Sequence, residues 1–198
     1  MAEEKGASWA DPGFIGLMAL AAGVASLWPI LVGIIPKEGV PLVIGWMLVT
    51  GIALIICGVI CLRLGNVIVG APCIVFGAVI NCGTAASFWL ETWGAANGIN
   101  IVAVPINGWV LLVIGFLALG MGWPFGKVAW TMFAWMMDLA LCFWFIGLGF
   151  LGVLPAVFVV IGGWLLCGFN VGTLYFALAG HINTVFGPKC YLGAPIFK

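Results

Sequence analysis

The sequence predicts an all-α membrane protein with six transmembrane helices, and two observations support that fold class. Charge is scarce, because the 198 residues include only six Lys or Arg and six Asp or Glu, while 65% are hydrophobic. A soluble domain carries roughly a quarter of its residues as charge. Apolar runs of about 20 residues recur along the chain with the charges in the gaps, and each could cross a hydrocarbon core of about 30 Å as a helix.

The first three predicted spans cover residues 13–35, 41–62 and 67–90. The first is too long for the apolar region of a signal peptide, so we expect a retained helix; it stops at the segment 36–39. Pro41 suits the first turn of the second span, where a missing N–H costs nothing. The third is expected to close at Glu91, before a loop over 91–105 that is rich in Gly, Asn and Ala.

The last three predicted spans cover 103–122, 128–152 and 155–180, with a tight turn at 123–127. The chain is therefore predicted to form one six-helix domain over 1–198, with a short polar segment 1–12 and a tail 181–198.

Positive charge predicts the orientation of these spans. With both termini inside the cell, inner segments hold five basic residues, namely Lys5, Arg63, Lys127, Lys189 and Lys198, and outer loops hold only Lys37. Cytoplasmic loops carry such an excess of Lys and Arg. We therefore expect an N-in, C-in, multi-pass protein of the inner (plasma) membrane.

Several function classes lack the residues they need. Net charge is zero and no basic patch could hold nucleic acid. The chain has a single histidine, no CxxC, and none of the common hydrolase, nucleotide-binding or dinucleotide-binding motifs. We expect no enzyme activity, no metal site and no cofactor.

Polar residues inside the predicted spans are the candidates for lining a pathway, since they are costly in lipid and tend to face the bundle interior. Asp138 lies near the middle of the fifth span, and is expected to be neutral unless partnered. It would either handle protons or orient a solute, or it would form a structural hydrogen bond to a neighbouring helix or subunit. The other candidates are Asn81, Thr84 and Ser87, which share a helix face at i, i+3, i+6, and Asn170 and Thr173. Each of these could line a hydrated path or join helices.

Three segments resemble signatures of one family, the acetate uptake transporters, or succinate–acetate permeases. The start of the first span reads Asp11-Pro12-Gly13-Phe14-Ile15-Gly16-Leu17, which is similar to the family's N-P-A-P-L-G-L, with matches at Pro12, Gly16 and Leu17 and with Asp11 in place of Asn. The turn 63–66 resembles its K-K-G-N. Gly163-Trp164, Tyr175-Phe176-Ala177 and Asn183-Thr184-Val185-Phe186-Gly187 resemble its C-terminal G-W, Y-L-A and N-x-x-F-G.

This resemblance implies a ring-shaped homo-hexamer in the bilayer, with a pore inside each protomer that carries acetate or a related small carboxylate, as an anion channel or permease. It also implies an apolar pore constriction at Leu20, Phe76 and Leu139. Two alternatives stay open on the residues alone. One is a neutral small-solute channel for urea, ammonia or water, and the other is a structural subunit of a membrane complex.

Overall fold

The computed structural model describes residues 10–101 and 103–197, so Lys5, Trp9, Lys198 and most of the segment 1–12 lie outside the described residues. The described chain is helical and contains six helical spans long and apolar enough to cross a membrane, as predicted. The elements, in chain order, are α1 (Gly13–Leu31), the short 3-10 turn η1 (Lys37–Gly39), α2 (Val40–Arg63), α3 (Val67–Val75), the π-helical turn η2 (Phe76–Cys82), α4 (Gly83–Ala96), α5 (Val104–Gly126), α6 (Trp130–Phe150) and α7 (Val157–Phe186). The third span is one continuous rod made of α3, η2 and α4.

Four predicted helix ends are wrong. The first span stops at Leu31, because the chain turns at Gly33 with φ +77° and the amides of residues 34 and 35 return to the carbonyl of Pro29. The third continues past Glu91 to Ala96. The fourth includes most of the predicted turn, since α5 ends at Gly126. The sixth passes Gly180 and ends at Phe186, and Gly187 follows with φ +77° and ψ −174°, a backbone conformation that is essentially restricted to glycine.

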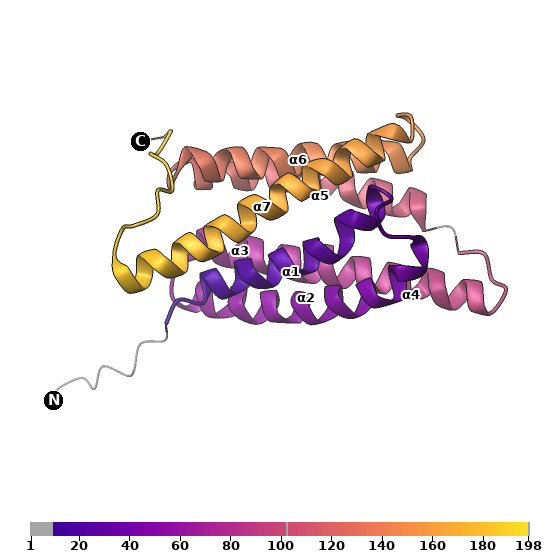
Figure 1. Cartoon of the computed structure of the whole chain (residues 1–198), viewed down its shortest axis with the longest axis horizontal. Coiled ribbons are helices and arrows are strands. Elements are labelled where there is room, and N and C mark those ends of the chain that lie inside the picture. Colours follow the sequence, from indigo (N-terminus) through magenta and orange to yellow (C-terminus); the bar gives the residue numbers. More distant parts are fainter. Residues whose placement is uncertain (1–9, 102, 198) are drawn as a thin grey trace.

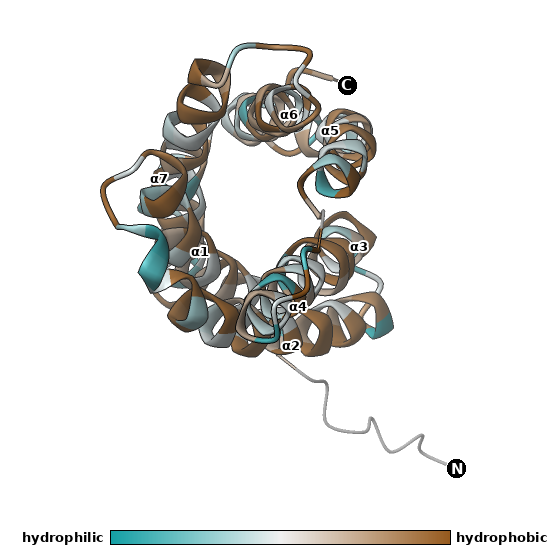
Figure 2. Cartoon of the chain, turned by 90° about the vertical axis from the view of Figure 1, so that its right-hand side faces the viewer, coloured by the Kyte–Doolittle hydropathy of each residue, from teal (hydrophilic) through white to brown (hydrophobic). Residues whose placement is uncertain are grey.

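The helices form a closed ring around one axis. Going round it, α5 packs on α6, α6 on α7, α7 on α1, and α1 on α2; α2 packs on the α3–η2–α4 rod, and α3 returns to α5 (Figure 2). The outer surface is strongly hydrophobic, with many large apolar side chains exposed. Such a surface fits a lipid environment rather than water.

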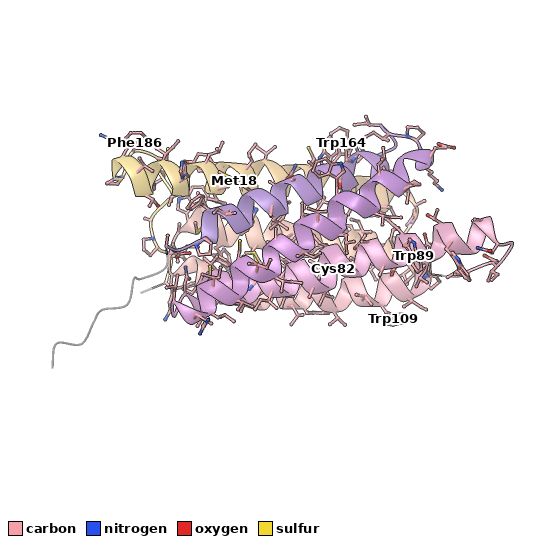
Figure 3. All side chains as sticks on the ribbon, turned by 90° about the horizontal axis from the view of Figure 1, so that it is seen from below. Met18, Cys82, Trp89, Trp109, Trp164 and Phe186 are labelled. Atoms are coloured by element: carbon pink, nitrogen blue, oxygen red, sulfur yellow. The ribbon has the colours of Figure 1, made fainter. Side chains whose placement is uncertain are left out.

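The two ends of the ring can be named by what lies there. At the terminal end, α1 begins and α7 ends (Figure 1), and the rings of Phe14 and His181 lie 4.9 Å apart. At the loop end lie the α1–α2, α4–α5 and α6–α7 connections. Trp89 and Trp109 project outward towards the loop end (Figure 3), with exposed fractions of 55% and 65%. Exposed tryptophans at this level are typical of a membrane–water interface.

Candidate functional site

Three cavities follow one another along the axis of the ring. The terminal-end cavity has a volume of about 230 Å³, the loop-end cavity about 260 Å³, and the middle cavity only about 20 Å³. The middle cavity shares Leu20 and Phe76 with the terminal-end cavity, and Leu27, Ile80, Phe143 and Leu166 with the loop-end cavity. Two wider spaces are therefore joined by a space of about one water molecule, since holding a water takes at least about 10–15 Å³.

Two helices supply a continuous apolar stripe along this axis. On α1 the lining side chains are Leu17, Leu20, Val24, Leu27 and Leu31, and on α6 they are Met132, Trp135, Leu139, Phe143, Ile146 and Phe150. Both sets follow the alternating three- and four-residue spacing that keeps side chains on one helix face. The same spacing places the stripe of each helix in all three cavities.

The three side chains of the predicted constriction meet at the middle cavity. Leu20 of α1, Phe76 of η2 and Leu139 of α6 all line it, and each is at most 3% exposed. They come from three different helices, so a constriction at this level depends on how those helices are spaced.

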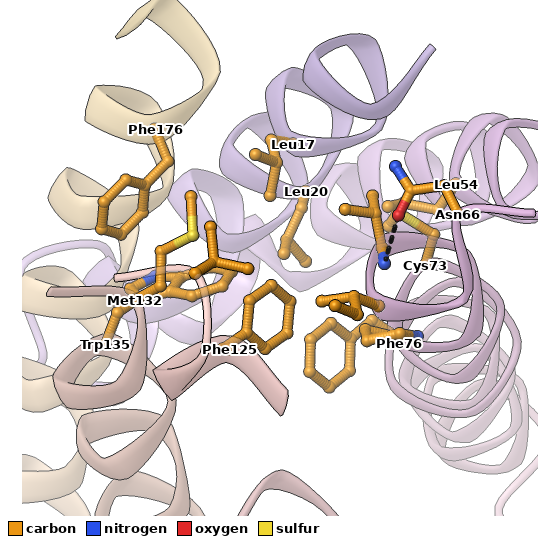
Figure 4. A pocket seen from close by; sticks show the side chains of 14 residues that line it. Leu17, Leu20, Leu54, Asn66, Cys73, Phe76, Phe125, Met132, Trp135 and Phe176 are labelled. Carbon is orange, nitrogen blue, oxygen red and sulfur yellow. Dashed lines mark hydrogen bonds between the residues drawn. The ribbon is translucent and has the colours of Figure 1, made fainter. Parts of the chain in front are cut away.

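The terminal-end cavity is apolar except for one amide (Figure 4). Asn66 contributes that amide, and its Oδ1 accepts a hydrogen bond of 3.3 Å from the backbone N–H of Val69, which caps α3. The other lining residues are Leu17, Leu20, Leu54, Ile68, Val69, Pro72, Cys73, Phe76, Phe125, Val128, Met132, Trp135 and Phe176.

Asp11 joins two of the resembling motifs at the mouth of this cavity. Its Oδ2 accepts a hydrogen bond of 2.8 Å from Asn66 Nδ2, and its Oδ1 accepts bonds from the Gly13 backbone at 2.8 Å and from the Cys61 thiol at 3.4 Å. Partial burial acts to raise the pKa of Asp11, but the bonds from Asn66, Gly13 and Cys61 outweigh it and lower the pKa below its usual value. The start of α1 is therefore tied to the α2–α3 turn by an ionised carboxylate.

Two polar side chains line the loop-end cavity, Thr84 and Asn107. Asn107 Nδ2 donates a 2.8 Å hydrogen bond to Ser87 Oγ, and the Ser87 hydroxyl lies 3.2 Å from Asn107 Oδ1, which connects α4 to α5. The sequence had not singled out Asn107 as a lining residue, because a position in the first turn of a helix does not reveal which neighbour it faces. Asn66 was missed for a similar reason, since it lies in a turn.

Asn81 does not share a face with Thr84 and Ser87, contrary to the prediction. It is fully buried against α2, and its Nδ2 donates a 3.0 Å hydrogen bond to Thr50 Oγ1. Each three-residue step on an α-helix falls about 60° short of a full turn, so Asn81 and Ser87 lie about 120° apart around the axis. Asn81 therefore faces α2, whereas Thr84 lines the loop-end cavity and Ser87 bonds to Asn107 of α5.

Asp138, Asn170 and Thr173 line none of the three cavities. Asp138 lies beside the stripe of α6 rather than on it, and its Oδ2 faces Gly168 of α7, 3.6 Å from where a Cβ would stand. Thr173 is fully buried, donates to the Phe169 carbonyl at 2.8 Å and accepts from the Trp135 indole at 3.1 Å. Its hydroxyl joins α6 to α7.

The described cavities are apolar in character, with few polar groups in their walls. Their lining contains no charged side chain. Within residues 10–101 and 103–197, no group of three or more His, Cys, Asp or Glu could hold a metal ion.

Comparison with known proteins finds the same fold in a solved structure. The structure of the bacterial acetate channel SatP matches this chain with a TM-score of 0.81 and 19% sequence identity, over 96% of this chain and 98% of that one. No family of proteins matches the sequence, and no curated protein does. At this level of identity the likeness establishes the fold, a ring of apolar membrane helices.

Proposed function

We propose that this chain is a channel or permease for small monocarboxylates, acetate above all, with its path inside the protomer. One observation carries the proposal: the three cavities lie in series inside a single ring of membrane helices, with the narrowest in the middle. The fold likeness to an acetate channel and the resembling motifs support the choice of cargo. An apolar narrow point with sparse polar groups favours weak binding and fast passage.

The proposal also assigns the narrow point of the path, the polar groups along it, the oligomeric state and the orientation in the membrane. Leu20, Phe76 and Leu139 form the constriction, and Thr84, Asn107 and Asn66 are the polar groups that a solute meets on either side. The chain works without catalysis, as a homo-hexamer in the inner membrane with both termini in the cytoplasm. Among the described residues, the terminal-end connections carry three basic residues, Arg63, Lys127 and Lys189, whereas Lys37 lies in a loop-end connection, which supports this orientation.

A flux assay tests the path and the cargo together. We expect purified protein in liposomes to carry labelled acetate well above empty liposomes. Cys73 already lines the terminal-end cavity, so the test is made in a Cys73→Ala background. There Met132→Cys places a thiol in the cavity, and a charged thiosulfonate reagent should block the flux of this variant. Val185→Cys in the same background, on α7 at the same end but lining none of the cavities, is the matched control, and the Cys73→Ala chain accounts for the other six natural cysteines. Equal sensitivity of these three proteins would contradict a path through this cavity.

A neutral-solute channel is the second candidate, and the absence of charged side chains from all three cavities favours it. Such a lining offers an anion no fixed cation. Stopped-flow swelling in urea, run beside labelled acetate uptake, separates the two: urea permeation without acetate uptake would support the second candidate and contradict the first.

A further inference from the structure

Three helices meet at a buried polar contact immediately behind the middle cavity. The Thr50 hydroxyl on α2 donates 2.7 Å to the Trp46 carbonyl and accepts 3.0 Å from Asn81 Nδ2 on η2. Gly23 of α1 lies against this pair: a Cβ there would stand 2.6 Å from Thr50 Oγ1 and 2.7 Å from Asn81 Nδ2. Real Cβ atoms essentially never approach other atoms so closely, so any larger residue here would require α1 or the Thr50 and Asn81 side chains to move.

The same three helices carry the walls of the narrow point. Leu20 and Val24 flank Gly23 on α1, and Phe76 and Ile80 precede Asn81 in the π-helical turn. All four line the middle cavity. A change in the distance between α1 and η2 at Gly23 is therefore expected to change the separation of Leu20 and Phe76, one helical turn or so away on the same two elements.

The polar pair is held firmly enough to act as a spacer. Asn81 is fully buried, and its neighbour α2 approaches η2 so closely that a Cβ on Gly51 would lie 2.8 Å from the Gly77 carbonyl oxygen and 3.0 Å from Asn81 Cβ. Asn81 Oδ1 is itself buried without a hydrogen-bond partner. An unsatisfied buried acceptor is costly, and each one in a native structure calls for an explanation. This cost has an explanation if Asn81 is kept for the distance that its side chain and Thr50 together span between the helices, rather than for the number of hydrogen bonds it makes.

We propose that Gly23, Thr50 and Asn81 form a spacer that sets the width of the middle cavity and thereby the largest solute that passes. They are positioning residues, which act through Leu20 and Phe76 and touch no solute. The effect on which solutes pass rests on the proposed function, whereas the effect on the separation of Leu20 and Phe76 does not.

Gly23→Ala is the direct test. Because Asn81 is fully buried and hydrogen-bonded to Thr50, we expect the new methyl group to push α1 away from this pair, which separates Leu20 from Phe76 and widens the middle cavity. We expect the ratio of propionate to acetate flux in liposomes to rise on the order of tenfold, because these acids differ by one methylene group and an apolar site discriminates one methylene group by about that factor. Gly45→Ala on α2 is the matched control, since a Cβ there meets nothing within 4 Å, and its ratio should stay that of the unsubstituted chain.

A rescue variant separates spacing from general damage. In Gly23→Ala/Thr50→Ala/Asn81→Ala both offending polar groups are gone, and the nearest remaining Thr50 atom is the Cβ, 3.5 Å from the new methyl group. The flux ratio should return towards that of the unsubstituted chain. A ratio that stays high in the rescue variant would overturn the spacer, because truncated side chains could no longer be pushing α1.

Electron cryomicroscopy of the unsubstituted chain and Gly23→Ala gives the separation of Leu20 and Phe76 without any transport measurement. A larger separation in Gly23→Ala is the expected result. An unchanged separation overturns the spacer, whatever the protein carries. A larger separation in a protein that carries neither acid leaves the spacer geometry standing and overturns the proposed function instead.

Discussion

Truncating two walls of the middle cavity gives the sharpest test of the proposed constriction. Leu20 and Phe76 are 3% and 2% exposed and both border a space of only about 20 Å³, so the double variant Leu20→Ala/Phe76→Ala removes much of what separates the two wide cavities. We expect the ratio of succinate to acetate flux to rise on the order of tenfold or more, because a larger acid no longer meets the closed apolar ring.

The same double variant has a stability cost that can be estimated from burial. Buried Leu→Ala changes cost about 2–5 kcal/mol and Phe→Ala changes about 3–5 kcal/mol. The low end of each range applies here, since both side chains already border a cavity, and the two costs do not add fully because both residues line the same cavity. Thermal unfolding in detergent measures the loss of stability.

The control for this experiment is Phe116→Ala. Phe116 is 65% exposed on the outer face of α5 and lines none of the cavities, so its truncation should leave the flux ratio unchanged. A double variant that is well folded by size-exclusion chromatography, yet keeps the size selectivity of the unsubstituted chain, would refute the placement of the constriction at Leu20 and Phe76.

Three further outcomes are expected. Asp138→Asn should leave acetate flux and its pH profile unchanged, because Asp138 lines none of the cavities; a flux that loses its pH dependence would reinstate a proton-handling role. The folded-state pKa of Asp11 is lowered, so its hydrogen bonds stabilise the fold above the unfolded-state pKa of about 3.9, and this stability is lost as the pH falls through the lower folded value. Unfolding temperatures measured from pH 6 to pH 3 should therefore fall less steeply for Asp11→Asn, and parallel curves would contradict the assignment. Native mass spectrometry in mild detergent should show a hexamer, and a dominant monomer or dimer would count against the ring-shaped assembly.

Much of the fold was predictable because lipid imposes a strong constraint on sequence. A run of apolar residues without charge can satisfy its backbone in a bilayer only as a helix or within a closed barrel. The six spans therefore follow from hydropathy. The apolar character of their outer surface also follows from the sequence, without knowledge of how the helices pack. The helix ends did not follow from hydropathy: α7 continues through Gly180, whose φ is not positive, and ends before Gly187, whose φ of +77° breaks the helical backbone.

The candidate site was likewise predictable in part: the spacing of its apolar residues is visible in the sequence, but the direction in which each helix face points is not. The four leucines and the valine of α1 that line the cavities repeat at three- and four-residue spacing, a pattern present in the sequence, but hydropathy alone gives every face of a membrane helix the same apolar character. Asp138 shows the consequence. Its depth in the membrane was predictable, whereas its position beside the α6 stripe, facing Gly168, depends on the rotation of α6 within the ring.

The sequence by itself determined that this is a membrane protein of six helices, because a chain with 6% charged residues cannot cover a surface exposed to water and its apolar runs match the thickness of a bilayer. Tertiary structure alone decided which side chains surround the axis. The contact of Gly23 with Thr50 and Asn81 joins the first three spans, and the π-helical turn at Phe76–Cys82 shifts the facing of every residue beyond it relative to α3. Packing between helices sets both features, and no local pattern of residues encodes the distance at which two helices come to rest.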